Sequence, residues 1–231
     1  MKVFVGLCLL TIAVTTPVDK KLGDHWSYAA GYEECPDWVD PAKTIPKPIE
    51  KICGGTLECP GYEDVANTNC GFGARRVAAG KWVGTNVNIR KGGQGYSEAF
   101  KRLFNYITFE NEEGGRINMT APVITKGYLN QEFDLINSTM HFFIPSDLAN
   151  PPAPTSNLVY IEDWEEITVY FRVLGESSGK ITEAEWEEEF TNLSAALEKS
   201  EIGYNSFLSV VGGFTDPWSQ QQRTEVMLVG A

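Results

Sequence analysis

The chain carries the same order of secondary-structure signals twice: strand, strand, helix, strand, strand. In the first stretch we expect strands and a helix at Tyr62–Ala66, Gly71–Val77, Lys81–Ile89, Tyr96–Thr108 (the helix), Arg116–Lys126 and Thr139–Ile144. After the rigid break Asn150–Pro154 the order returns at Leu158–Ile161, Ile167–Leu174, Glu183–Ser200 (the helix), Asn205–Val211 and Glu225–Val229. Two such halves are most simply accommodated in one α+β domain, an antiparallel sheet covered by two helices.

The periodicity of apolar residues supports each assignment. Lys81–Ile89 alternates with period two, with Trp82 and Gly84 on one side and Val83 and Thr85 on the other. The helical stretches show apolar stripes at i, i+3, i+4 and i+7 spacing: Phe100, Leu103, Phe104 and Ile107 in the first, and Trp186, Phe190, Leu193 and Leu197 in the second.

Composition limits the partners. The 231 residues carry a formal net charge of −12 and 42% are hydrophobic, so the chain can bury a core but presents no basic surface for nucleic acid. Residues 1–15 read as a signal peptide, because Lys2 precedes the uncharged apolar run Val3–Val14. That run is too short to span a bilayer, and no second one follows, so we expect a secreted protein with no integral membrane segment.

Cysteine usage agrees with export. The mature chain would keep four cysteines, Cys35, Cys53, Cys59 and Cys70, which in an oxidising compartment read as two disulfides. Three connectivities are possible, of which we favour Cys53 with Cys59 and Cys35 with Cys70. The proline-rich residues 16–56 then form an irregular segment tied down by these bonds. Asn118, Asn137 and Asn192 begin N-x-S/T sequons and are predicted glycosylation sites.

Motifs that suggest catalysis or metal binding are incomplete. Gly175–Gly179 matches the GxSxG elbow around Ser177, but no histidine follows it to complete a hydrolase triad. The glycines at Gly92–Gly95 lack the Lys-Ser/Thr of a phosphate loop. His141 lies in a strand and is expected to be a structural histidine rather than an iron ligand. We therefore expect neither a catalytic residue nor a metal site.

Several short motifs in a fixed order resemble the SOUL haem-binding protein family, specifically its secreted, haem-binding-protein-2-like branch. The most diagnostic run is Ile117–Val123 (INMTAPV). The others are Lys81-Trp82-Val83 with Thr85, Phe100, Arg102–Phe104, Tyr106-Ile107, Ile144–Ser146, Pro151-Pro152 with Pro154, Ile161-Glu162, Thr168–Tyr170, Arg172, Gly213-Phe214, Asp216-Pro217, Arg223 and Glu225-Val226. The similarity extends from Glu58 to Ala231, and we take residues 57–231 as the SOUL domain.

The resemblance implies a barrel-like domain of two pseudo-symmetric halves and no enzymatic reaction. It implies haem or a related porphyrin bound non-covalently in an apolar surface pocket beside the first helix. The implied binding residues are Phe100, Lys101, Leu103, Phe104, Trp218 and Arg223, with Lys101, Arg102 or Arg223 near the propionates. Arg76 stands near the place where some members carry a histidine. The expected function is a secreted tetrapyrrole carrier or scavenger; the alternative is a secreted glycoprotein interaction module that has lost haem binding.

Overall fold

The computed structural model describes residues 53, 57–67, 72–174, 183–215 and 223–231. By its internal contacts the chain divides into residues 1–33 and 34–231, and every described residue belongs to the second unit. The predicted signal peptide, Cys35, Cys70, Ser177 and Trp218 lie outside the described residues.

The order of elements agrees with the sequence prediction, and the predicted strand at Tyr62–Ala66 is β1, which precedes the two repeated halves. The elements are β1 (Tyr62–Asn67), β2 (Gly73–Val77), β3 (Gly80–Asn86), the short 3-10 helix η2 (Ile89–Lys91), α2 (Gly93–Thr108), β4 (Val123–Leu129), β5 (Leu135–Phe143), β6 (Val159–Trp164), β7 (Ile167–Val173), α3 (Glu183–Lys199), β8 (Tyr204–Gly213) and β9 (Thr224–Gly230).

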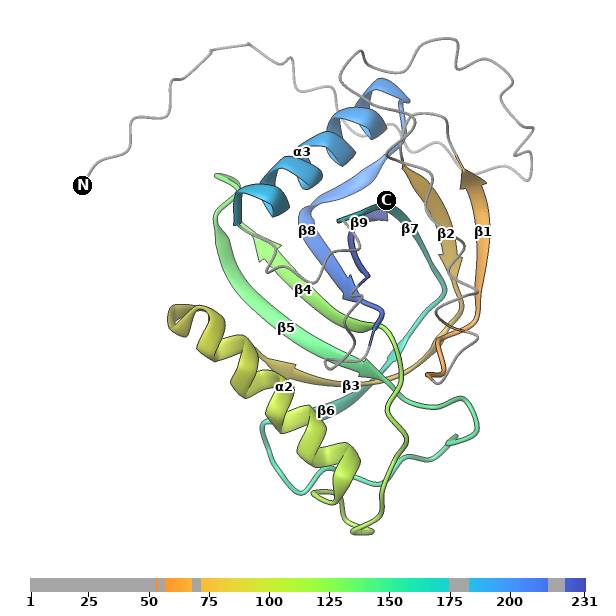
Figure 1. Ribbon diagram of the computed structural model, residues 1–231, viewed down its shortest axis with the longest axis vertical. Helices are drawn as coiled ribbons and strands as arrows, with labels where there is room; N and C mark the ends of the chain where they lie inside the picture. The colour runs from red at the N-terminus through yellow and green to blue at the C-terminus, as the bar shows by residue number, and fades with distance from the viewer. Residues whose placement is uncertain (1–52, 54–56, 68–71, 175–182, 216–222) are drawn as a thin grey trace. The chain divides into compact units, whose positions relative to one another are not determined.

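All nine strands belong to one antiparallel sheet in the order β1-β2-β7-β9-β8-β4-β5-β3-β6. Strand β6 lies at one edge and pairs only with β3, whereas β7 lies near the other edge between β2 and β9. Only Glu165 and Glu166 join β6 to β7, so the two edges must approach each other and the sheet curls (Figure 1). The expected α+β, barrel-like architecture is confirmed.

The strand order is pseudo-symmetric. Strands β2, β3, β4 and β5 of the first half correspond to β6, β7, β8 and β9 of the second half. Exchanging each strand for its counterpart reverses the strand order from β2 to β6 and leaves every pairing the same. The symmetry centre lies between β4 and β8, which pair from Val123 opposite Gly213 to Tyr128 opposite Leu208. The first strand of each half pairs with the second strand of the other half, so neither half can form its sheet alone.

Each helix covers its own half of the sheet on the convex side, and the concave side holds a third core (Figure 1). Leu103 and Ile107 of α2 pack with Val83 and Phe142, while Leu193 and Leu197 of α3 pack with neighbouring strands of the second half. The core on the concave side consists of Trp82, Ile124, Phe143, Val169, Phe171, Val210, Phe214 and Met227. Val83 and Trp82 point to opposite sides of β3, as the alternation predicts.

Several predicted strands have other bounds in the structure; for example, β5 begins at Leu135 and not at Thr139. The strand expected over Arg116–Lys126 begins only at Val123, because Pro122 has no backbone N–H to offer a neighbouring strand. The strand expected over Lys81–Ile89 ends at Asn86, and Ile89 starts η2 instead. Among the described helices, none is long and apolar enough to cross a membrane.

Candidate functional site

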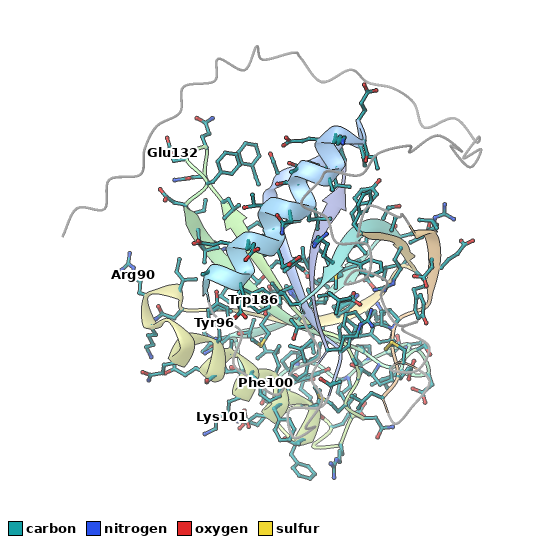
Figure 2. All side chains as sticks on the ribbon, turned by 45° about the horizontal axis from the view of Figure 1, so that its top comes forward. Arg90, Tyr96, Phe100, Lys101, Glu132 and Trp186 are labelled. Atoms are coloured by element: carbon teal, nitrogen blue, oxygen red, sulfur yellow. A yellow bond between two sulfur atoms is a disulfide. The ribbon has the colours of Figure 1, made fainter. Side chains whose placement is uncertain are left out.

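The outer edge of α2 carries an aromatic pair that is only partly buried. Phe100 and Phe104 stand one turn apart with ring centroids 6.1 Å apart and ring planes 15° from parallel. Phe100 also meets Phe142 of β5 edge-on at 5.3 Å, which holds the pair against the sheet. Tyr96, one turn earlier, continues this half-buried stripe along α2 (Figure 2). The stripe presents flat apolar surface beside the helix.

The two cations of α2 differ in whether they are hydrogen-bonded to the protein. Lys101 is exposed and extends from α2 (Figure 2). Arg102 is held by β3, because its Nε donates to Thr85 Oγ1 at 2.9 Å and its Nη2 donates to the Asn86 carbonyl. Lys101 is therefore the cation of α2 best placed to meet an anionic group in solvent.

The structure does not bring all the predicted binding residues together. Leu103 is fully buried in the core under α2, so it supports the helix and faces no solvent. Arg223 is buried on the other half of the domain, just before β9, where it contacts Glu225. Only Phe100, Lys101 and Phe104 thus share an accessible edge; Trp218 lies outside the described residues.

Arg223 belongs to a buried ion cluster on the concave side of the sheet. Glu225, which has no accessible surface, accepts from Arg223 Nε at 2.9 Å and Nη2 at 2.6 Å, and from Arg75 Nη1 at 3.0 Å. The Arg75 guanidinium also lies 3.3 Å from Asp64 and 4.1 Å from the Phe171 ring centroid. The two arginines thus form hydrogen bonds and ion pairs with acidic residues of the protein itself, which is typical of a structural role.

Glu162 of β6 organises a second polar cluster in the other half. Its Oε1 accepts from Trp164 Nε1 and lies 3.0 Å from His141 Nε2. His141 is 1% exposed, and its Nδ1 has no hydrogen-bond partner. A neutral ring that donates from Nε2 to Glu162 satisfies this arrangement, because a proton on Nδ1 would be buried without an acceptor. Burial accordingly lowers the pKa of His141 to about 3.

The buried position that the sequence favours for His141 is observed. Gly84, on the strand next to it, is required for the packing, since a Cβ there would lie 2.7 Å from both the His141 and the Tyr160 rings. Among the described residues no group of three or more possible metal ligands occurs.

The concave side also contains a pocket that the sequence did not indicate. Its walls are mostly apolar side chains from strands of both halves. Two charged side chains line it, Arg75 and Lys126, and both are positive. The available signal was Lys126 itself, a lysine at an inward position of the β4 run Val123–Leu129.

A disulfide-closed loop lies at the rim of this pocket. Cys53 and Cys59 are bonded, which confirms the predicted pair, and both line the pocket together with Pro60. Glu58, inside the loop, accepts from the backbone N–H of Ala121 at 2.8 Å and of Ser146 at 2.8 Å. Glu58 thus links the disulfide region to the segment that precedes β4 and to the segment that follows β5.

The predicted glycosylation asparagines lie at the surface to different degrees. Asn118 and Asn137 are exposed, and Asn192 is partly exposed on α3. None lies on the α2 edge formed by Phe100 and Phe104.

The sequence profile of the SOUL heme-binding protein family matches residues 57–229, which cover both halves of the sheet. This chain belongs to the SOUL heme-binding protein family. It is 30% identical to heme-binding protein 1 of Xenopus laevis over 161 residues, covering 68% of this chain and 83% of that protein. It is 28% identical to human heme-binding protein 2 over 200 residues, covering 83% of this chain and 95% of that protein. Both relatives are named for binding and not for catalysis.

Proposed function

We propose that this protein is a secreted tetrapyrrole carrier or scavenger, and that the macrocycle lies on the edge of α2 against Phe100 and Phe104. The observation that carries the proposal is the pair of near-parallel, half-buried rings on a helix of a SOUL heme-binding domain. Flat apolar rings suit a flat apolar macrocycle, and burying its area contributes about 25 cal/mol per Å². Lys101, which is exposed on the same helix, is the proposed partner of a propionate.

Among the described residues, no histidine or cysteine is available as an iron ligand. His141, within the described part of the chain, is inaccessible, and Cys53 and Cys59 are bonded to each other. Binding through the macrocycle plane predicts that hemin and metal-free protoporphyrin have similar affinities. The Soret band of each, followed during titration of the purified protein, tests this.

Phe104→Ala is expected to weaken hemin binding by about tenfold or more, because it removes half of the aromatic pair. Since Phe104 is only partly buried, the variant should lose about 1–3 kcal/mol of unfolding free energy, less than a fully buried phenylalanine. Hemin titration and urea unfolding measure the two effects.

Phe190→Ala is the matched control. Phe190 stands on α3, is partly buried, and packs against the core of the second half. Its loss should reduce stability by a similar amount and leave hemin affinity unchanged. Equal affinity losses in both variants, or none in either, would show that the α2 edge is not the site.

Export is the second part of the proposal. It is supported by the apolar run after Lys2, the three sequons and the cysteines. We expect protein expressed in cultured animal cells to appear in the medium without residues 1–15, and to contain no free thiol. Its mobility should increase after glycosidase treatment. Intracellular retention with an intact N-terminus would refute this part.

The alternative function, an interaction module, is favoured by a different surface. Phe133 and Phe207 are 62% and 47% exposed, and their rings stack at 6.1 Å, 12° from parallel. An exposed aromatic pair of this kind is more common at contact surfaces than elsewhere. If neither hemin nor protoporphyrin binds saturably, this surface becomes the better candidate for function.

A further inference from the structure

Lys126 is the least satisfied charged group in the interior pocket. Its side chain is 19% exposed, and its nearest carboxylate oxygen, Glu162 Oε1, is 3.9 Å away, beyond hydrogen-bonding distance. Its ammonium lies 3.4 Å from the centroid of the Trp164 ring, which provides a cation–π contact but accepts no ordinary hydrogen bond. Glu162 is already used by Trp164 and His141. Among the described residues, Lys126 thus has three donors and no hydrogen-bonded acceptor.

Arg75, the other cation of the pocket, differs in this respect. Its guanidinium is bonded to Glu225, lies near Asp64 and covers the Phe171 ring. Its charge is therefore compensated within the protein. Lys126 has only a long ion pair with Glu162 and no hydrogen bond to the described residues, so its ammonium can donate to an acceptor that enters the apolar pocket.

We propose that the interior pocket binds a small apolar carboxylate whose hydrocarbon part packs among the strands and whose carboxylate accepts hydrogen bonds from Lys126. The apolar wall facing Lys126 is suitable, because Ile124, Val210 and Met227 line it. The Trp82–Trp164 stack, with centroids 4.1 Å apart, forms a rigid side next to the ammonium. This site is separate from the α2 edge and does not depend on tetrapyrrole binding there.

The charge of Lys126 gives the site a pH dependence. Facing it are Glu162 from β6, neutral His141 from β5 and Arg75 from β2. Burial lowers the pKa of Lys126 to about 8, so the ammonium is mostly charged at pH 7 and becomes neutral above pH 8. Carboxylate affinity should therefore fall as the pH rises from 7 to 9.

The test uses isothermal titration calorimetry of the purified protein with octanoate, decanoate and the uncharged decanol, all below their aggregation concentrations. Decanoate should bind saturably at pH 7, more tightly than decanol. Each methylene added between octanoate and decanoate should tighten binding by up to about fourfold. Lys126→Met should weaken decanoate at least tenfold, leave decanol unchanged and abolish the pH dependence.

Lys199→Met is the matched control, because it removes an exposed lysine at the end of α3 that does not line the pocket, and it should leave decanoate binding unchanged. A urea midpoint for Lys126→Met at or above that of the unsubstituted protein shows that the variant is folded. Equal affinities for decanoate and decanol, or an unaffected Lys126→Met, would overturn the proposal, as would no saturable binding. Decanoate binding that is unchanged in hemin-saturated protein supports a separate site, whereas competition would overturn it by placing the tetrapyrrole in the pocket.

Discussion

Glu225→Ala is expected to lower the unfolding free energy by about 3–5 kcal/mol. Glu225 has no accessible surface, and two guanidinium groups, those of Arg75 and Arg223, donate to its carboxylate. Without that carboxylate, both buried cations lose the anion that they share, and the cost of keeping them away from water is no longer offset. Urea unfolding followed by circular dichroism measures the loss.

Asp163→Ala provides the control for this prediction. Asp163 forms an ion pair with the Lys81 ammonium at 2.7 Å, but Asp163 is 71% exposed and Lys81 36% exposed. Solvent screens this pair, so its removal should cost at most about 1 kcal/mol. Similar losses for the two variants would mean that burial does not determine the importance of the Glu225 cluster.

The fold could be predicted because its determinants are local. The alternation in β3 predicts that Trp82 and Val83 lie on opposite sides of the sheet, and the structure confirms this, with Trp82 in the core of the concave side and Val83 in the core under α2. The apolar stripes of the two helices likewise identify the faces that are buried. The repeated order of elements predicts two halves, although it does not say which strands pair between the halves.

The ion clusters could not be predicted because their members are far apart in the chain. Arg75 and Glu225 are 150 residues apart and meet only because β2, β7 and β9 are neighbours in the curled sheet. From sequence alone Arg223 is simply a cation, and the resemblance to the SOUL family suggested a propionate partner. The structure gives it a buried carboxylate instead.

The candidate binding site could be predicted only where its residues are close together in the chain. Phe100, Lys101 and Phe104 are neighbours on one helix, so local spacing places them together. Leu103 shares their helical stripe, but its burial depends on the sheet beneath it, which spacing alone does not describe. The interior pocket is formed by strands of both halves, which the sequence does not show to be neighbours. The only local signal for it is the inward position of Lys126 in β4.

The stability of the protein is expected to fall as the pH decreases from 7 to 5, and His141 should account for about 2 kcal/mol of that loss. Burial lowers the pKa of His141 from 6.5 to about 3 in the folded protein. Below pH 6.5 the unfolded chain therefore binds a proton at His141 that the folded protein does not bind. The stability contributed by this histidine is complete above pH 6.5 and decreases by about 4 kcal/mol by pH 3.

His141→Gln separates this effect from the titration of other groups. Glutamine stays neutral and retains an N–H for Glu162, so the variant should keep a folded interior while its stability changes less with pH. The measurement is the urea-unfolding free energy of both proteins at pH 7, 6 and 5. From pH 7 to pH 5 the unfolding free energy of the unsubstituted protein should fall by about 2 kcal/mol more than that of the variant. Parallel curves would mean that His141 takes up its proton equally in the folded and unfolded protein, and that the Glu162 cluster tolerates a charged imidazole.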